Sequence, residues 1–330
     1  MVGYGSIARE HARAISRLQG TAAGSDLRLY GVMGRDLNQA EAFAQEFGMG
    51  VATTDLRAAL DDPKVDVVLI TSPTDLHAEQ AQMALAAGKD VLCEIPLATS
   101  LPETDRVLRA AEASGRTLMV CHTQRYYEGI SAARRMVAEG QLHPHAFMGR
   151  QIRLRRENIN WKGRRRTWTD NLLWHHACHS VDTALWVLGA TEVDVVAQVA
   201  LPGGNLNIPM DLTIVMRTPR DQIATILMSY NSHFALHDYM IFGEEASVVW
   251  EEDQLRTPEK VLAGALDASA QEEAIVRQDA EFFAAVRERR EPAISAGAVR
   301  PTMVVLQSVQ DILDKRLSAE NRGTRHPDLP

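Results

Sequence analysis

Short apolar runs alternate with amphipathic, alanine-rich segments through the first 122 residues of the chain. The apolar runs are strand-sized and rich in β-branched residues, whereas the segments between them repeat apolar positions at helical spacing. We predict strands at residues 28–33, 65–72, 90–93 and 117–121. We predict helices at residues 7–18, 37–47, 76–87 and 101–114. This alternation is typical of a parallel sheet covered by helices.

From about residue 146 the pattern changes to longer apolar runs that follow one another closely. We predict strands at residues 146–154, 193–201, 212–217, 222–230, 238–242 and 247–251, and helices at 272–287 and 299–315. Consecutive strands indicate a largely antiparallel sheet, with Gly243-Glu244-Glu245 as a hairpin turn. The expected fold is therefore an α/β domain at residues 1–122 and an α+β domain with a large, mostly antiparallel open sheet at 123–320. Residues 321–330 are polar and are expected to form a disordered tail.

A helix that begins near Asn171 should cover one face of this second sheet. The other face also carries apolar residues, and an open apolar sheet face is a common surface for dimerisation. We therefore expect a homodimer or a larger homo-oligomer that forms through the C-terminal sheet.

Composition narrows the class of protein. The 330 residues carry a net charge of -8, which disfavours binding to nucleic acid or to an anionic membrane. The longest apolar runs are far shorter than the roughly 20 residues of a membrane helix, and no secretory signal opens the chain. Cys93, Cys121 and Cys178 are far apart and odd in number, which favours reduced thiols. We expect a cytoplasmic protein.

The chain opens with Gly3-Tyr4-Gly5-Ser6-Ile7-Ala8, a G-x-G-x-x-A turn that leads into a helix. In a Rossmann dinucleotide-binding domain such glycines let the backbone approach a pyrophosphate, which the helix N-terminus then binds. Gly3, Gly5, Ser6, Ile7 and Ala8 are therefore candidate cofactor contacts. Only Met1 and Val2 precede the turn. The central strand is therefore unusually short, or the start is internal to a longer gene product, which is the explanation we favour.

The second predicted strand ends in Met33-Gly34-Arg35-Asp36. An acidic residue at this position usually binds the ribose 2′-OH of NAD, whereas an arginine suits the 2′-phosphate of NADP. Gly34 leaves room for a phosphate and Arg35 can bind it with its planar guanidinium. NADP is the expected cofactor, with NAD possible if Arg35 is solvated and Asp36 binds the ribose.

Two loops after predicted strands carry the resemblance to a known family. They are Ser72-Pro73-Thr74-Asp75-Leu76-His77 and Cys93-Glu94-Ile95-Pro96-Leu97. With them the chain resembles the glucose–fructose oxidoreductase/inositol dehydrogenase/MocA family of dehydrogenases. The resemblance implies cofactor contacts at Ser72, Pro73, Thr74, His77, Glu94, Ile95 and Pro96. In that family a lysine that assists the chemistry stands where this chain has Ile95, and an isoleucine can only shape the pocket.

A histidine-bearing segment is the most specific motif. Residues 167–182 read TWTDNLLWHHACHSVD and contain His175, His176 and His179. Neutral imidazole suits proton transfer near pH 7, and spacings of three and four bring these side chains close together on a helix. Asp182 could orient His179, the first choice as catalytic base, because His179 aligns with the histidine that the family uses. Asp170 and Asn171 should cap this helix.

A metal is an open alternative at the same segment. His175 and His179 have the spacing of two ligands on one helix face, but no glutamate follows His175 as in HExxH. Hydride transfer needs no metal, so we expect none.

Seven basic residues lie between positions 153 and 166 of an otherwise acidic chain. They are Arg153, Arg155, Arg156, Lys162, Arg164, Arg165 and Arg166. Arginine pairs with planar carboxylates through two parallel hydrogen bonds, so part of this cluster could bind a carboxylated substrate. The alternative is a solvated run of charge.

The other candidate substrate contacts flank the cofactor domain and the histidine segment. Arg125 and Tyr126 follow the last predicted strand of the first domain, and aromatic side chains could form walls for a flat substrate. Trp161, Trp168 and Trp174 are the candidates, although packing in the core suits each of them equally well.

Together these patterns predict an NADP-dependent oxidoreductase. The long histidine motif resembles a subgroup that removes hydride from the hemiacetal or hydroxyl carbon of a small carboxylated intermediate of aromatic catabolism. A sugar or cyclitol dehydrogenase of the same family is the nearest alternative. A non-catalytic NADP-binding regulator is the alternative from another class, but it leaves the clustered histidines unexplained.

Overall fold

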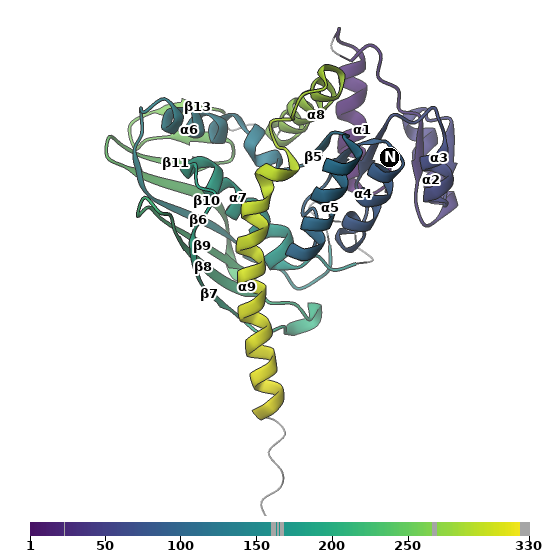
Figure 1. The fold of residues 1–330 in the computed structure, drawn as a ribbon. Coiled ribbons are helices and arrows are strands. Elements are labelled where there is room, and N and C mark those ends of the chain that lie inside the picture. The colour runs from purple at the N-terminus through teal and green to yellow at the C-terminus, as the bar shows by residue number, and fades with distance from the viewer. Residues whose placement is uncertain (23, 160–162, 164, 166–167, 266–268, 324–330) are drawn as a thin grey trace, which may run out of the picture. The chain divides into compact units, whose positions relative to one another are not determined.

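The computed structural model describes residues 1–22, 24–159, 163, 165, 168–265 and 269–323. These residues form two compact units (Figure 1). The first contains Met1–Tyr127 and Asp267–Arg300, and the second contains Glu128–Leu266 and Pro301–Pro330. The first unit thus includes a late segment of the chain, whereas the sequence predicted one boundary near residue 122. The last seven residues of the predicted tail lie outside the described residues, and residues 321–323 continue a helix.

The first unit contains the predicted parallel sheet and its helices. Its strands are β1 (Gly31–Met33), β2 (Val51–Thr53), β3 (Val67–Ile70), β4 (Asp90–Cys93) and β5 (Leu118–Val120). Its helices are α1 (Ser6–Gln19), α2 (Leu37–Phe47), α3 (Leu56–Asp61), α4 (His77–Ala86), α5 (Leu101–Ser114) and α8 (Ala270–Glu288), with short 3-10 turns at Thr74–Leu76 and Thr123–Tyr126. Helix α8 contacts α1. The Rossmann architecture predicted for this part of the chain is confirmed.

Val2 joins the two halves of this sheet. It forms parallel bridges with Met33, at the end of β1, and with Ile70, at the end of β3. The Val2 amide donates to the Leu69 carbonyl at 2.8 Å, and the Gly3 amide donates to the Met33 carbonyl at 2.8 Å. The short segment at Val2 therefore lies between β1 and β3 and delivers the glycine turn to the carboxyl ends of the strands.

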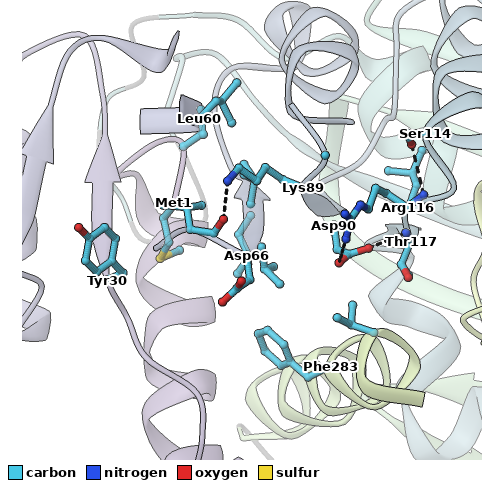
Figure 2. A pocket seen from close by; sticks show the side chains of 18 of the residues that line it. Met1, Tyr30, Leu60, Asp66, Lys89, Asp90, Ser114, Arg116, Thr117 and Phe283 are labelled. Atoms are coloured by element: carbon cyan, nitrogen blue, oxygen red, sulfur yellow. Dashed lines mark hydrogen bonds and ion pairs between the residues drawn. The ribbon is translucent and has the colours of Figure 1, made fainter. Parts of the chain in front are cut away.

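A cavity of about 1490 Å³ lies at the opposite, amino ends of these strands. Figure 2 shows Met1 and Tyr30 on one side of it, Asp90 on the other, and Phe283 of α8 nearby. The Met1 amino group donates to the Gly31 carbonyl at 2.7 Å, and burial lowers the pKa of this amino group to about 6. Ligands of open α/β sheets bind at the carboxyl ends of the strands, so this cavity is separate from the expected cofactor site.

The second unit is built on an eight-stranded sheet in the order β13-β12-β11-β10-β6-β9-β8-β7. Only β6 and β9 pair in parallel; the other neighbours are antiparallel. The strands are β6 (Pro144–Leu154), β7 (Asp194–Val199), β8 (Asp211–Arg217), β9 (Ile223–Ser229), β10 (Asn231–Gly243), β11 (Ser247–Glu251), β12 (Gln254–Arg256) and β13 (Val261–Ala263). The predicted antiparallel sheet and its turn after Gly243 are confirmed.

Helices cover one face of this sheet, as Figure 1 shows for the labelled elements. They are α6 (Glu128–Ala138), the π-helix at Leu172–Ala177, α7 (Cys178–Leu188) and α9 (Ala296–Gly323), with a 3-10 turn at Gly204–Leu206. Helix α7 contacts β6 and β9. Side chains on the covered face, such as Phe147, Ile226 and Met228, are at most 1% exposed and form the core. Among the described helices, none is long and apolar enough to cross a membrane.

Candidate active site

The glycine turn has the geometry of an anion-binding site. Gly3 has a φ of 106°, and a Cβ there would lie 2.6 Å from the Thr71 carbonyl oxygen, so only glycine fits. Gly5 is different, because a Cβ there would point into open space. Gly5 also caps α1 without a side-chain hydrogen bond, and Ala8 in the first turn is fully buried. The N-terminus of α1 therefore has no side-chain cap, and the cofactor contacts at Gly3, Gly5, Ser6, Ile7 and Ala8 stay a prediction.

The tip of β1 contains a glycine with a structural neighbour that was not predicted. A Cβ on Gly34 would lie 2.0 Å from the Tyr4 ring, so glycine leaves room for this ring, and its predicted contact with a phosphate stays a prediction. Arg35 is exposed. Asp36 caps α2, since its Oδ1 accepts a hydrogen bond from the Gln39 amide at 3.1 Å. Exposed Arg35 and the second carboxylate oxygen of Asp36 both stay candidates for binding the ribose end of a nucleotide.

The two family loops are tied together by His77. This buried imidazole lies 2.8 Å from the Pro96 carbonyl oxygen through Nδ1 and 2.9 Å from the Ser72 carbonyl oxygen through Nε2. The Ser72 hydroxyl donates to Gln80 at 2.5 Å. The Ile95–Pro96 peptide bond is cis, and Ile95 is 2% exposed. His77 thus holds both loops through their backbones, whereas Pro73 and Thr74 belong to the turn after β3.

Glu94 contacts a buried, charged pair, His11 and Asp279, that was not predicted from the sequence. His11 of α1 contacts both carboxylate oxygens of Asp279 through Nδ1, at 2.8 and 3.0 Å, and Glu94 through Nε2, at 3.0 Å. Burial opposes protonation of His11, but these carboxylates outweigh it and hold its pKa well above 6.5. Glu94 also accepts a hydrogen bond from the Ile95 amide at 3.0 Å. His11 therefore positions Glu94 at the carboxyl end of β4.

The histidine segment of the second unit begins as a π-helix. Asn171 caps it by accepting a hydrogen bond from the Leu173 amide at 2.8 Å, as predicted for Asn171. The rings of His175 and His176 lie 4.9 Å apart, and those of His175 and His179 lie 6.4 Å apart. Neighbouring side chains of a regular α-helix do not face each other. The wide turn therefore gathers all three imidazoles, and π-turns often mark functional sites.

Asp170 is not the cap that the sequence predicted. It is 2% exposed and forms an ion pair with buried Arg155. Arg155 also donates to the Tyr230 hydroxyl at 3.1 Å. The other Asp170 oxygen lies 3.4 Å from Nε2 of His176. The correction has a simple cause: a carboxylate beside a buried guanidinium is worth more as a charge partner than as a cap.

His176 lies between two side chains of β6. Its Nε2 receives a hydrogen bond from the Arg153 guanidinium at 3.1 Å, and its Nδ1 lies 3.3 Å from the Gln151 amide. Burial is the main cause that lowers the pKa of His176 to about 4; the hydrogen bond and charge of Asp170 oppose it, and the charges of Arg153 and His179 support it. His176 is therefore neutral near pH 7.

His237 is a second neutral histidine at this site, and sequence reasoning missed it. It lies on β10 directly opposite Gln151, so both side chains share one face of the sheet. Burial lowers its pKa to about 4, with contributions from His179 and His176. Its Nε2 lies 3.3 Å from the Tyr239 hydroxyl, which is 3.0 Å from Ser180 of α7. A single histidine in a strand carries no signal that would have identified it.

Asp182, which was predicted to orient His179, forms a hydrogen bond with a residue of another helix. Asp182 is 1% exposed and accepts a hydrogen bond from Thr302 of α9 at 3.1 Å. Its orienting role toward His179 stays a prediction. His179 lies on the covered side of the sheet, so near to His176 and His237 that a positive charge on its imidazole would lower the pKa of both.

The remaining candidate substrate contacts differ in their surroundings. Arg125 is buried and donates to the Ala298 carbonyl at 3.4 Å. The Tyr126 hydroxyl is buried and has no hydrogen-bond partner among the described residues, and burial raises its pKa. Arg165 is exposed and pairs with Glu157. Arg164 lies outside the described residues.

The predicted tryptophan contacts also differ in their surroundings. Trp168 packs edge-on against His175, with the ring centres 6.3 Å apart, so it borders the histidine segment. Trp174 is 4% exposed and donates its indole N–H to Gln310 of α9 at 2.9 Å, which fits packing in the core. Trp161 lies outside the described residues.

The charges around the histidines favour an anion over a metal ion. Asp170, His175 and His176 offer ligand atoms within 4.8 Å of one another. Arg155, however, is paired with Asp170, and Arg153 donates to His176. Asp170 balances the charge of Arg155, so a cation placed here would be repelled by the Arg153 guanidinium, whereas a carboxylate would be attracted by it.

Comparisons with known proteins agree with this picture. Residues 1–122 match the model of the oxidoreductase family with an NAD-binding Rossmann fold, and residues 131–261 match that of the C-terminal domain of bacterial oxidoreductases. The chain is 30% identical over 318 residues to 4-carboxy-2-hydroxymuconate-6-semialdehyde dehydrogenase of Sphingobium sp. SYK-6, covering 96% of this chain and 98% of that protein.

Other similar proteins are named as sugar or cyclitol dehydrogenases. Inositol 2-dehydrogenase of Gluconacetobacter diazotrophicus is 31% identical over 204 residues, covering 61% of this chain and 57% of that protein. The fold matches levoglucosan dehydrogenase in complex with NADH and levoglucosan with a TM-score of 0.82 at 21% identity, over 95% of this chain and 96% of that one. The chain therefore belongs to the glucose–fructose oxidoreductase/inositol dehydrogenase/MocA family and is an NAD(P)-binding dehydrogenase.

Proposed function

We propose that this dehydrogenase uses NADP+ to oxidise the cyclic hemiacetal of 4-carboxy-2-hydroxymuconate semialdehyde to 2-pyrone-4,6-dicarboxylate in the cytoplasm. The observation that carries the proposal is the cluster of histidines beside Arg153. The His179 imidazole can accept a proton, and the Arg153 guanidinium can attract a carboxylate, so one cluster offers both functions that this substrate needs. Similarity along 96% of the chain to a dehydrogenase of that semialdehyde supports it.

The proposed chemistry divides between the two units. Gly3, Gly5 and the first turn of α1 would hold the pyrophosphate, and Arg35 the 2′-phosphate. The cofactor, when bound, supplies the acceptor for the hydride. His179 accepts the hydroxyl proton as the carbon–hydrogen bond of the hemiacetal breaks and the lactone carbonyl forms. Ile95 cannot exchange a proton, so this task falls to the histidine segment.

A substrate panel tests the proposal. NADPH formation is followed at 340 nm with the enzymatically generated semialdehyde, myo-inositol, glucose and levoglucosan, each with NADP+ and with NAD+. The proposal expects turnover of the carboxylated substrate and at most weak turnover of the neutral ones. Turnover of the polyols alone would support the alternative, a sugar or cyclitol dehydrogenase, which similarity to the inositol enzyme favours.

The preference for NADP+ rests on Arg35. Replacing Arg35 with alanine removes the side chain proposed to pair with the 2′-phosphate, so we expect the Kd of NADP+ to rise roughly 10-fold to 100-fold. The Kd of NAD+ should change less than about threefold, since NAD+ has no such phosphate. Titration of both nucleotides by calorimetry checks this. An equal loss of affinity for both nucleotides would show that Arg35 does not bind the 2′-phosphate.

The uncovered face of the large sheet is the proposed interface between copies of the chain. Val196, Val215, Ile223 and Leu227 lie on three neighbouring strands, point away from the helices and are 67%, 37%, 45% and 40% exposed. We expect Ile223→Lys with Leu227→Lys to yield a monomer by light scattering, because buried lysines would oppose association. Wild-type protein that is already monomeric at working concentration would contradict the proposed interface.

A further inference from the structure

The hydrogen bonds of His176 fix the position of its proton. The Arg153 guanidinium donates to Nε2 at 3.1 Å, and a guanidinium can never accept a hydrogen bond. Neutral imidazole carries one proton, so Nε2 must offer its lone pair and Nδ1 must carry the hydrogen. Asp170 lies farther from Nε2, at 3.4 Å, and is already paired with Arg155. Arg153 therefore decides the tautomer.

This tautomer determines which end of the Gln151 amide faces His176. The structure has the amide nitrogen 3.3 Å from Nδ1, while the amide oxygen is buried and has no hydrogen-bond partner among the described residues. A half-turn of the amide exchanges these two ends without changing its shape. The Nδ1 hydrogen needs an acceptor, so the oxygen belongs beside His176. The amide NH2 then occupies the buried position that lacks a partner.

Gln151 and Arg153 lie two positions apart on β6 and so point to the same face of the sheet. With the amide turned in this way, Gln151 would present a buried N–H donor without an acceptor next to a guanidinium. Leaving such a donor unpaired is unfavourable, so a ligand with acceptor atoms should satisfy it. Two donors, one of them charged, suit an acceptor that is itself an anion.

We propose that the Gln151 amide and the Arg153 guanidinium form a binding site for one carboxylate of the substrate, with His176 as the positioning residue between them. The identity of the substrate rests on the proposed function, but the carboxylate site does not. A polyol hydroxyl could accept from Gln151 but would leave the guanidinium without a counter-charge. The site therefore selects carboxylated ligands over neutral ones.

Binding of isophthalate, a flat dicarboxylate, tests the site by calorimetry on the NADP+-loaded protein. Gln151→Glu keeps an oxygen for the Nδ1 hydrogen but replaces the NH2 with a second oxygen that repels a carboxylate. We expect Gln151→Glu, Gln151→Met and Arg153→Met each to weaken isophthalate binding roughly 10-fold to 100-fold. Gln45→Met and Arg109→Met are matched controls, since both residues are exposed on helices of the first unit. The neutral isophthalamide should bind weakly to all six proteins.

Nitrogen NMR of His176 supplies an independent readout. We expect a protonated Nδ1 and an unprotonated Nε2 in wild type and in Gln151→Glu, and loss of this preference in Arg153→Met. A protonated Nε2 in wild type would overturn the proposal. Isophthalate affinity that is undetectable in wild type, or unchanged in all three site variants, would overturn it too. If isophthalate binds as expected but the semialdehyde is not oxidised, only the proposed function fails.

Discussion

Replacing His179 with alanine is expected to lower kcat for the carboxylated hemiacetal by about 10²-fold to 10⁴-fold, the usual contribution of a general base. The Kd of NADP+ should stay within about twofold of wild type, since His179 belongs to the second unit and the glycine turn to the first. Stopped-flow absorbance at 340 nm and calorimetry measure the two quantities.

Two further variants make the His179 result specific. His145→Ala removes an exposed histidine of β6 and should leave kcat unchanged. Asp182→Asn keeps the shape of the side chain but removes the charge proposed to stabilise the His179 cation, so the pKa seen in the pH profile of kcat should fall. Wild-type turnover by His179→Ala would exclude this residue as the base and leave His237 or His175 as candidates.

Acid should destabilise the protein between pH 6.5 and 4 through His176 and His237. Their pKa values fall from 6.5 to about 4 on folding, so the unfolded state binds more protons in this window. Their stabilising effect is complete above pH 6.5 and is lost as the pH falls through 4. At about 1.4 kcal/mol per pKa unit, each histidine accounts for about 3 kcal/mol.

The contribution of His11 to stability depends on pH in the opposite direction. Its folded pKa lies well above 6.5, so its contribution is complete below pH 6.5 and is lost as the pH rises toward that raised pKa. These three histidines together predict greatest stability near pH 6.5. Urea unfolding at several pH values measures the free energy, and His237→Gln should reduce the loss between pH 6.5 and 4. If His237→Gln loses as much free energy of unfolding as wild type between pH 6.5 and 4, His237 does not cause the acid destabilisation.

The sequence predicted regular elements best where local patterns were strong. The helix at residues 37–47 and the strand at 90–93 have their predicted limits, since an aspartate or a short apolar run marks each one. Strand β2, helix α3 and helix α6 were missed. Strand β2 has three residues, all only half-buried, so it lacks the apolar run that identifies the other strands. Tertiary pairing with β1 alone makes it a strand.

The candidate site was predictable where a local sequence motif identifies its residues. The glycine turn and the histidine segment could be identified because glycine and imidazole have few equally good structural uses. The roles of Gly34, Asp170 and His11 depend on partners that no local pattern specifies. His11 and Asp279 are 268 positions apart, and the contact between them exists only because α1 packs against α8.

Deuterium transfer shows directly whether hydride moves from the aldehyde carbon to the nicotinamide. The semialdehyde is prepared with deuterium on the aldehyde carbon, incubated with the protein and NADP+, and both products are analysed by mass spectrometry and proton NMR. Our account predicts 2-pyrone-4,6-dicarboxylate without deuterium and NADPH with one deuterium at C4 of the nicotinamide. Unlabelled NADPH, or no consumption of the semialdehyde while myo-inositol is oxidised, would contradict it.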